Sequence, residues 1–338
     1  MKALVYTAPR RMELQDLPRP EPGPGEVLIK VEAAGICGSD VHGFRGLSAR
    51  RKPPLVMGHE LTGRVAALGP GIVDVPLEQQ VVVNPLLPCD TCELCLSGRS
   101  YICPNRKLIG MDLPGAFAEY VTVPASSLYP LPEGMSPTVG TMAEPLANTV
   151  HIIRHNVFGL VQGVAILGAG IQGLLALQMV RVAGITPRIS IDIEPHRLEI
   201  ASRFGAKVII NAREQDPVAI VREATKGRGV DLVIDAVGAD VTRQQAIAMA
   251  APGGRVVFLG LNEVMSELDC QAIVTQELTV HGSYAYSPHD FLTALDLLAS
   301  GRVEVASWLE EAPLVDGQRV FEMLADRPGE HIKAVLIP

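Results

Sequence analysis

The sequence predicts an α/β protein of two domains, one similar to a β-barrel and the other a doubly wound parallel sheet. Three observations lead to this expectation. The chain has 338 residues, which exceeds the usual length of one domain. Short β-type runs separated by Pro- and Gly-rich turns occupy about the first 145 residues. From about residue 146 onward, strand-like and helix-like segments alternate, as in a parallel sheet with crossover helices.

The first domain is predicted to consist mainly of strands. Runs rich in β-branched and apolar residues lie at residues 2–6, 27–34, 63–68, 80–83 and 117–123. Near the C-terminus, a helical pattern at 290–300 precedes an apolar, strand-like tail at 334–337. Because this tail could return to the first set of strands, we assign residues 1–146 and 286–338 to the first domain.

The second domain, residues 147–285, is predicted to hold a six-stranded parallel sheet. Its candidate strands lie at residues 164–167, 188–192, 207–210, 231–235, 255–260 and 278–283. Helical patterns that each end before a glycine lie between the earlier strands, at residues 171–183, 196–204 and 218–225. This alternation is typical of a doubly wound sheet.

Charge and hydropathy argue against several classes of function. The net charge is −8 and no run of Lys and Arg supplies a clustered basic surface, so nucleic-acid binding is not expected. No apolar stretch reaches the roughly 18–20 residues that span a bilayer, and the N-terminal residues hold no apolar signal core. We therefore expect a cytoplasmic protein that contacts no membrane.

Four of the six cysteines follow one another with the spacing C-x2-C-x2-C-x7-C. Zinc takes four thiolate ligands in a tetrahedron, and such short intervals let one loop supply all of them. Disulfides are the alternative, but positions i, i+3 and i+6 fit disulfide geometry poorly and a reducing cytosol disfavours them. The spacing predicts a structural zinc site with no open coordination position, made by Cys89, Cys92, Cys95 and Cys103.

A second, dispersed set of residues could hold a catalytic metal ion. Cys37 lies in GICGSDVH, His59 and Glu60 lie in GHE, and Glu144 lies in MAEPLAN. A thiolate, an imidazole and a carboxylate suit zinc and leave one position open, where a bound alcohol would lose its proton more easily. Taken singly, each residue is more often structural than catalytic, and spacing alone does not rank His59 above the other histidines.

Two polar residues that follow Cys37 could carry a proton. Ser39 could take the proton from a metal-bound alcohol, and His42 could deliver it to solvent. The alternative for Ser39 is that its hydroxyl only caps a turn, and on the residues alone this alternative is the more common one.

A dinucleotide-binding fingerprint is predicted where the first strand of the second domain meets its helix. The pattern G-x-G-x-x-G spans residues 168–173, directly after the apolar run at 164–167. The glycines allow a tight turn and a close approach of a pyrophosphate to the helix N-terminus. The residues expected to bind the cofactor here are Gly168, Gly170, Ile171, Gln172 and Gly173.

Asp192 ends the next predicted strand, 19 residues after Gly173. A carboxylate there would bond the ribose 2′-hydroxyl and repel a 2′-phosphate, which favours NAD over NADP. The alternative is a helix N-cap, and Asp192 could serve both ways. Arg197 could instead accommodate a phosphate, although its place within the following helical pattern favours a surface position.

Taken together, these segments resemble the zinc-containing medium-chain dehydrogenase/reductase superfamily over essentially the whole chain. The Glu-Pro pair at 144–145 is similar to the polyol branch, which includes sorbitol, galactitol-phosphate, threonine and butanediol dehydrogenases. The motifs that carry the resemblance, specific in combination, are GICGSDVH (35–42), GHE (58–60), the four-cysteine loop (89–103), GAFAEYVTVP (115–124), AEPLA (143–147), GAGIQG (168–173) and DLVIDAVG (231–238).

The resemblance implies a GroES-like β-barrel catalytic domain with both zinc sites and a Rossmann domain that binds NAD. Cys37, His59 and Glu144 would surround the catalytic zinc, and Glu60 would either ligate it at rest or hydrogen-bond its water. Ser39, the nicotinamide ribose and a histidine, His42, would form the proton relay. A zinc-bound alkoxide of a secondary alcohol, diol, polyol or sugar-alcohol phosphate would give its hydride to C4 of NAD⁺.

One departure from the polyol pattern leaves the substrate open. Sorbitol-type enzymes place an arginine where this chain has Ala285. Arg45, Arg50 or Arg51 could supply the missing polar anchor, or could simply be exposed. An L-threonine 3-dehydrogenase and a non-catalytic zinc- and dinucleotide-binding redox sensor are the alternatives. The resemblance also implies a homodimer or homotetramer that pairs near residues 278–284.

Overall fold

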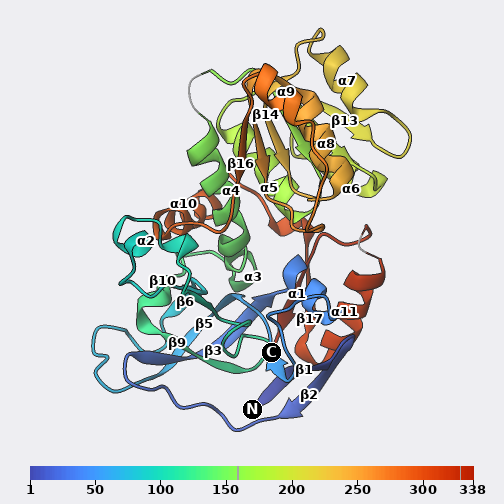
Figure 1. Ribbon diagram of the computed structural model, residues 1–338. Helices are drawn as coiled ribbons and strands as arrows, with labels where there is room; N and C mark the ends of the chain where they lie inside the picture. Colours follow the sequence, from blue (N-terminus) through green and yellow to red (C-terminus); the bar gives the residue numbers. More distant parts are fainter. Residues whose placement is uncertain (158–159, 328) are drawn as a thin grey trace. The chain divides into compact units, whose positions relative to one another are not determined.

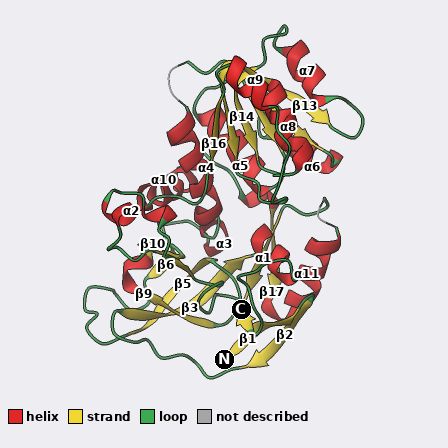
Figure 2. Ribbon diagram, in the orientation of Figure 1, coloured by secondary structure: helices red, strands yellow, loops and turns green. Residues whose placement is uncertain are grey.

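The computed structural model describes residues 1–157, 160–327 and 329–338, which form two compact units. Unit 1 comprises Met1–Glu144 and Ser287–Pro338, and unit 2 comprises Pro145–Tyr286. The sequence places the same two junctions at 146/147 and 285/286. Figure 2 shows that strands predominate in unit 1, whereas strands and helices are intermixed in unit 2.

The described part of unit 1 contains three sheets with short helices between their strands. Its strands are β1 (Lys2–Ala8), β2 (Arg11–Asp16), β3 (Glu26–Gly35), β4 (Leu55–Val56), β5 (Glu60–Leu68), β6 (Gln80–Val83), β7 (Leu86–Leu87), β8 (Lys107–Leu108), β9 (Tyr120–Pro124), β10 (Leu128–Pro130), β17 (Leu309–Pro313) and β18 (Lys333–Ile337). Its helices and 3-10 turns are α1 (Gly38–Phe44), α2 (Glu93–Leu96), η1 (Ser100–Ile102), η2 (Ala125–Ser127), α3 (Pro137–Gly140), α10 (Pro288–Ala299), η3 (Ala306–Trp308), η4 (Leu314–Asp316) and α11 (Gly317–Asp326).

The largest sheet of unit 1 is organised around β3. Within the described residues its order is β10-β6-β5-β3-β18-β17, and β9 pairs with the first half of β3. The smaller sheets have the orders β2-β1-β4 and β7-β8. β17 and β18 are parallel, while β3 runs antiparallel to β5, β9 and β18. β3 therefore positions the start of β5 and the C-terminal strand on its two sides.

The C-terminal segment completes the core of unit 1. The strand-like tail becomes β18, in which Val335 pairs with Gly35 of β3. Helix α11, which the sequence patterns do not predict, adds Phe321 to this core. Its ring centroid lies 5.2 Å from that of Phe44 and 5.7 Å from that of Phe117. Aromatic packing of this kind joins α1, the loop before β9 and the end of the chain.

Unit 2 is a doubly wound domain, as the alternation of segments predicts. Its described residues form a six-stranded parallel sheet in the order β13-β12-β11-β14-β15-β16, which Figure 1 shows with its helices. The strands are β11 (Val164–Leu167), β12 (Arg188–Asp192), β13 (Val208–Asn211), β14 (Val230–Asp235), β15 (Ala250–Phe258) and β16 (Thr279–Gly282). The helices are α4 (Ala143–Asn156), α5 (Ile171–Val182), α6 (Pro195–Arg203), α7 (Pro217–Ala224), α8 (Asp240–Met249) and α9 (Cys270–Thr275).

The centre of this sheet explains why the second domain is recognisable in the sequence. β11 reads Val-Ala-Ile-Leu and is buried on both faces between β12 and β14. A continuous apolar run is typical of a parallel strand covered on both sides. The chain then turns at the glycine loop into α5, so that this loop lies at the carboxyl end of a central strand. Ligands bind at that edge of open α/β sheets.

Candidate metal centres and dinucleotide site

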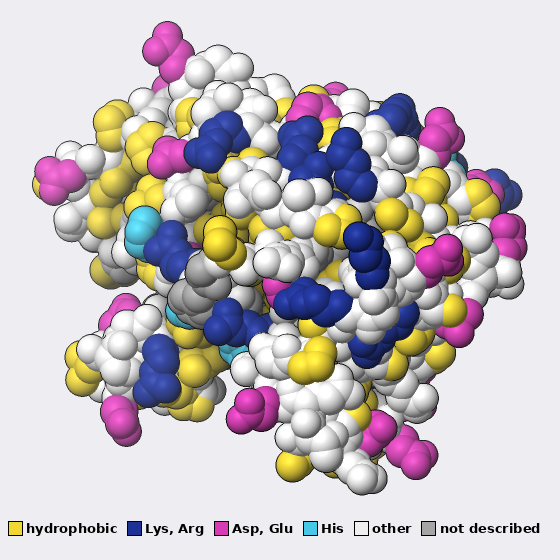
Figure 3. Space-filling model, turned by 90° about the horizontal axis from the view of Figure 1, so that it is seen from above, with side chains coloured by type: hydrophobic (Ala, Val, Ile, Leu, Met, Phe, Trp, Pro, Cys, Tyr) yellow, Lys and Arg dark blue, Asp and Glu magenta, His cyan; other side chains and the backbone are white. Residues whose placement is uncertain are grey.

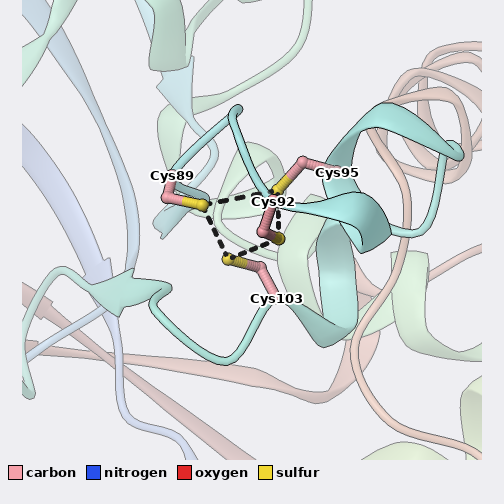
Figure 4. A group of neighbouring side chains, drawn as sticks. All are labelled: Cys89, Cys92, Cys95 and Cys103. Carbon is pink, nitrogen blue, oxygen red and sulfur yellow. Dashed lines mark hydrogen bonds between the residues drawn. The ribbon is translucent and has the colours of Figure 1, made fainter.

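The four cysteines of the loop at 89–103 converge in the structure (Figure 4). Their Sγ–Sγ distances are 3.5 Å for Cys89–Cys103 and for Cys92–Cys95, 3.8 Å for Cys92–Cys103 and 4.0 Å for Cys89–Cys95. A tetrahedral zinc ion with bonds of about 2.3 Å separates its sulfur ligands by about 3.8 Å. The four thiols therefore fit one tetrahedral ion and leave it no open position.

Hydrogen bonding and burial act in opposite directions on these thiols. The backbone and hydroxyl of Thr91 donate hydrogen bonds that lower the pKa of Cys89 to about 5. Burial, followed by hydrogen bonding to the neighbouring thiols, raises the pKa of Cys95 to about 12. Because adjacent thiolates repel one another, a cation would be needed to stabilise all four in the ionised form.

Three of the four residues predicted around a catalytic metal meet inside unit 1. Cys37, His59 and Glu60 each place a ligand atom within 4.8 Å of the others. His59 and Glu60 are buried and Cys37 is half-buried. Glu60 Oε1 is buried without a hydrogen-bond partner among the described residues. An unpartnered carboxylate oxygen is costly, and a cation would relieve that cost, so the residues fit a metal ion.

The fourth predicted ligand, Glu144, does not join this group. It lies half-buried in the first turn of α4. In the part of the chain that the structure describes, its carboxylate is not among the ligand atoms gathered with Cys37, His59 and Glu60. Its role as a zinc ligand stays a prediction.

Asp40 holds two of the converging residues, and our sequence analysis did not identify it. It is fully buried, and its Oδ1 lies 3.4 Å from His59 Nδ1. Its Oδ2 accepts a hydrogen bond of 3.1 Å from the backbone N–H of Cys37. A carboxylate that engages Nδ1 fixes the orientation of a ligand histidine and leaves Nε2 for the metal. The available signal was its position three residues after Cys37, in the helix that Cys37 caps.

Local electrostatics make this a site for positive charge. Burial raises the pKa of Asp40, but the charges of His59 and Arg51 outweigh it and lower that pKa to about 2. Burial likewise lowers the pKa of His59, yet the charges of Asp40 and Cys37 outweigh it and raise that pKa well above its usual value. The negative groups around the imidazole therefore favour a cation there, either a proton or a metal ion.

Lys333 holds Glu60 from the last strand of the chain, and it was also missed in the sequence. Its buried Nζ donates hydrogen bonds to Glu60 Oε2 and, over 3.0 Å, to the carbonyl oxygen of Ile36. Gly35 lies between the two side chains, where a Cβ would overlap Glu60 Oε2 and would approach Lys333 Cε to 3.1 Å. Oε1 is consequently the Glu60 oxygen that is left for a metal ion.

The two predicted relay residues lie one turn apart on α1. Ser39 Oγ accepts a hydrogen bond of 3.0 Å from Arg51 Nη2. His42 is exposed, and its Nε2 lies 3.1 Å from the carbonyl oxygen of Leu47. Because a carbonyl only accepts, Nε2 donates to it, and Nδ1 is the nitrogen that accepts a proton when the imidazole is neutral. Residues three apart share a helix face, which is the arrangement that a relay requires.

The three arginines considered as substrate anchors all have partners within unit 1. Arg45 donates to the carbonyl oxygen of Ala325, and Arg50 pairs with Asp112 at 2.5 Å. Arg51 is only 3% exposed, so the expectation that these arginines are simply exposed is wrong for Arg51. Its side chain faces the metal-binding group and not the solvent.

The glycine fingerprint adopts the backbone that its residue types require. Gly168 has a φ of +92°, and a Cβ on Gly173 would overlap the carbonyl oxygen of Gly168. Gly170 is the N-cap of α5, and Ile171 and Gln172 lie in the first turn of that helix. The loop thus leaves the amide groups of a helix N-terminus without side-chain cover, which suits a pyrophosphate.

Asp192 lies at the end of β12. Its carboxylate accepts hydrogen bonds from the glycine loop after β11 and from the residues that follow β12. Its Oδ2 accepts a hydrogen bond of 2.6 Å from the N–H of Ala169, within the fingerprint. Its Oδ1 accepts hydrogen bonds from the N–H groups of Ile193 at 2.7 Å and Glu194 at 2.9 Å. Glu194 and not Asp192 is the N-cap of α6, so the N-cap alternative is wrong. The carboxylate is nevertheless held in a fixed position by the loops.

Arg197 lies beside the glycine loop and not on the outer surface that we expected. It is half-buried, and a Cβ on Gly170 would lie 3.7 Å from its Nη1. The first turns of α6 and α5 are close enough for this contact because β12 and β11 are neighbours.

Metal analysis tests both metal groups, and we expect two zinc ions per chain. Cys92→Ser removes one ligand of the four-thiol site, and Cys37→Ser removes one of the dispersed site. Each should lower the zinc content of the purified protein, measured by mass spectrometry, to about one ion per chain. Cys270→Ser is the control, since Cys270 is exposed and belongs to neither group. Two ions retained in both ligand variants would contradict these assignments.

The buried ion pair between Lys333 and Glu60 makes a prediction about stability. Lys333→Met leaves Glu60 without its cation, and we expect the free energy of unfolding of unit 1 to fall by about 3–5 kcal/mol. Adding Glu60→Gln removes the uncompensated charge and should recover part of that loss. Urea denaturation measures both, with Lys30→Met, at an exposed position on β3, as the control. If Lys333→Met and Lys30→Met lowered the free energy of unfolding by the same small amount, the proposed ion pair would be refuted.

Comparison with known proteins agrees with this geometry. Residues 23–133 match the alcohol dehydrogenase GroES-like domain, and residues 172–300 match the zinc-binding dehydrogenase family. The L-threonine 3-dehydrogenase of Bacillus velezensis is 35% identical over 331 residues, which is 96% of this chain and 95% of that protein.

Solved structures extend the likeness over the whole chain. A protein of Escherichia coli CFT073, described as a short chain alcohol dehydrogenase complexed with cofactor NADH, has a TM-score of 0.93 at 28% identity, over 100% of this chain and 99% of that one. The galactitol-1-phosphate dehydrogenase of Escherichia coli has a TM-score of 0.91 at 28% identity, over 100% of both chains. On its motifs, its fold and these relatives, the chain belongs to the zinc-containing medium-chain dehydrogenase/reductase superfamily.

Proposed function

We propose that this protein is an oxidoreductase that uses zinc to transfer a hydride between NAD and a secondary alcohol, diol or polyol, including sugar-alcohol phosphates. The observation that carries the proposal is the convergence of Cys37, His59 and Glu60 around a buried, unpartnered carboxylate oxygen. A hydroxyl and an imidazole follow Cys37 in α1, of which Cys37 is the N-cap, so one ligand and both proposed proton carriers come from this helix and its cap.

Zinc in this group would act as a Lewis acid that eases loss of the alcohol proton, and bound NAD would accept the hydride. Cys37, His59 and Glu60 would hold the ion, with Glu144 as a proposed further ligand. Asp40 keeps the imidazole of His59 in one orientation through Nδ1. A ligand side chain held in one orientation by its neighbours is preorganised, and preorganisation lowers the cost of reaching the transition state.

The chain also provides a route for the proton. Ser39 Oγ accepts from Arg51, which leaves its own hydrogen and one lone pair for proton transfer. His42 is exposed and has a free acceptor nitrogen, so its imidazole can receive that proton and exchange it with water. An imidazole can both accept and release a proton, so it suits this step. We propose that the protein acts in the cytoplasm.

Unit 2 would bind the dinucleotide at the glycine loop. Gly168, Gly170 and Gly173 provide the tight turn, and the helix N-terminus suits the pyrophosphate. Asp192 keeps its carboxylate next to that loop, where it would accept a ribose hydroxyl and repel a 2′-phosphate. Arg197 would lie close to the same region of the cofactor. NAD is therefore the cofactor that we propose.

L-threonine 3-dehydrogenase activity is the second candidate, because the curated relative described above carries that name over nearly the full chain. Threonine is also a secondary alcohol, so the same metal group and relay would serve it. The two candidates differ in what anchors the rest of the substrate.

We propose that the protein forms a homodimer or homotetramer. β16 is the edge of the described six-stranded sheet and offers unpaired backbone groups to a second copy. Large apolar side chains are exposed on this strand and in the segments before it: Leu261, Val264, Met265, Val274 and Val280. Exposed apolar groups near a free strand edge are typical of a protein interface.

The proposed substrate is a small molecule and not a nucleic acid or a membrane. On the face shown in Figure 3, Lys and Arg side chains are separated by polar and hydrophobic ones and do not form a continuous basic surface. The net charge of −8 also supports this proposal. Among the described residues, the structure has no helix that is long and apolar enough to cross a membrane.

Asp192→Asn tests the cofactor assignment. The amide keeps an oxygen that can accept hydrogen bonds from the loop, but it loses the charge that would repel a 2′-phosphate. We expect kcat/KM for NAD to fall about tenfold or more, and the preference for NAD over NADP to shrink by more than that. Glu199→Gln, an exposed carboxylate on α6, is the matched control. An unchanged NAD to NADP ratio in Asp192→Asn would refute this role.

Reduction of NAD⁺ across a panel of alcohols tests the function itself. The panel comprises sorbitol, galactitol, polyol phosphates, 2,3-butanediol and L-threonine, and NADH absorbance is recorded. We expect turnover of at least one member, and none when Cys37 is replaced by serine. L-threonine as the preferred substrate would select the second candidate. If NAD binds and no alcohol is oxidised, the protein is better described as a redox sensor.

A further inference from the structure

Arg51 is a buried cation next to the proposed catalytic group, and it contacts Asp40 as well as Ser39. We propose that Arg51 is a positioning residue that orients the hydroxyl of Ser39 and fixes Asp40 against His59. This inference rests on the proposed function of the site. It replaces the idea that Arg51 contacts the substrate.

The contacts of Arg51 join the relay to the metal group. Its side chain is 2% exposed, and Nη2 lies 3.0 Å from Ser39 Oγ and 3.0 Å from Asp40 Oδ1. The same Asp40 oxygen lies 3.4 Å from His59 Nδ1. One nitrogen of one guanidinium therefore contacts both the proposed proton carrier and the residue that orients a metal ligand.

The Arg51 side chain runs along α1 at a position where the helix has a glycine. Gly43 lies on α1, and a Cβ there would approach Arg51 Cδ to 2.5 Å. The backbone N–H of Arg51 donates a hydrogen bond of 3.2 Å to Ser48 Oγ, which holds the chain after α1. A glycine is therefore needed on the helix face along which the arginine passes. This requirement gives a second way to disturb Arg51 without removing its charge.

The hydrogen inventory explains what Arg51 does for Ser39. A serine hydroxyl has one hydrogen and two lone pairs, whereas a guanidinium has donors only. Because Arg51 fills one lone pair of Ser39, the serine hydrogen cannot point at Arg51 and is left for a proton acceptor. Arg51 also compensates Asp40, a strong acceptor on the adjacent residue that would otherwise compete for that hydrogen. The hydroxyl is thus kept ready to accept one proton and release another.

A double-mutant cycle on alcohol oxidation tests this role. Arg51→Met should lower kcat by about 100-fold, the lower end of what a positioned proton carrier contributes, with KM for NAD within about twofold of wild type. In a Ser39→Ala background the same change should lower kcat by less than about threefold, because residues that act as a unit are not additive. Equal fold-losses in both backgrounds would overturn the proposal, because a purely structural arginine would act independently of Ser39.

Additional variants keep the test valid if Arg51→Met does not fold. Gly43→Ala displaces the arginine while retaining its charge, and it should show the same dependence on Ser39. Arg51→Lys retains a cation but lacks the planar fork, and we expect it to recover only part of the lost kcat. Lys52→Met is the matched control, since Lys52 is exposed and adjacent, and it should leave kcat unchanged.

Zinc release separates a failure of this inference from a failure of the proposed function. Arg51 contacts Asp40, and Asp40 orients His59. We therefore predict that Arg51→Met loses the zinc ion held by Cys37, His59 and Glu60 to a chelator about 10-fold faster or more, while the four-cysteine ion is retained. A dye that reports free zinc measures this without any turnover. Unchanged release would overturn the Asp40 link. If the wild-type protein oxidises no alcohol, the proposed function is wrong. The rates of zinc release would still test how Arg51 acts on the metal-binding residues.

Discussion

The negative charge of the buried Asp40 carboxylate must be balanced by nearby cations and hydrogen-bond donors. The groups that balance it also determine how the metal-binding residues are arranged. The two oxygens of Asp40 are contacted by the amide of Cys37, the imidazole of His59 and the guanidinium of Arg51. These groups come from the start of α1, the segment after that helix, and the turn before β5. Removing either cation would leave the buried charge of Asp40 less compensated, so the positions of His59 and Arg51 depend on Asp40. The residues proposed for catalysis are therefore held by the same interaction that stabilises this part of the fold.

A second buried charge pair joins β5 to the C-terminal strand β18. Glu60 and Lys333 are 273 residues apart in sequence, yet they come from strands on opposite sides of β3. Gly35 makes the approach possible because any side chain there would overlap the pair. The C-terminal strand thus contributes directly to the metal-binding group by deciding which oxygen of Glu60 is available.

Much of the fold was predictable because local patterns and tertiary structure agree. The strands of unit 2 were found near their true positions. The inner strand β11 is a continuous apolar run, β12 and β14 are also largely buried, and the order of alternating segments located the edge strands β13 and β16. Helices α5, α6, α7 and α10 were predicted, whereas α1, α2, α3, α4, α8, α9 and α11 were not. α8 has no glycine stop and continues directly into β15, whose start at Ala250 lies before the predicted residue 255. α9 is short, and α11 depends on packing against α1 and η4, which the sequence does not reveal.

The sequence by itself determined the chemistry that is encoded by spacing: four thiols that can reach one ion, glycines that permit a tight turn, and an acidic residue at the end of the next strand. It also supplied Cys37, His59 and Glu60 as candidates through their motifs. Only the tertiary structure decided that those three meet, and that Asp40, Arg51 and Lys333 support them. The physical reason is that compensation of buried charge acts between residues that are distant in the chain, and neither spacing nor periodicity records which buried charges will become neighbours.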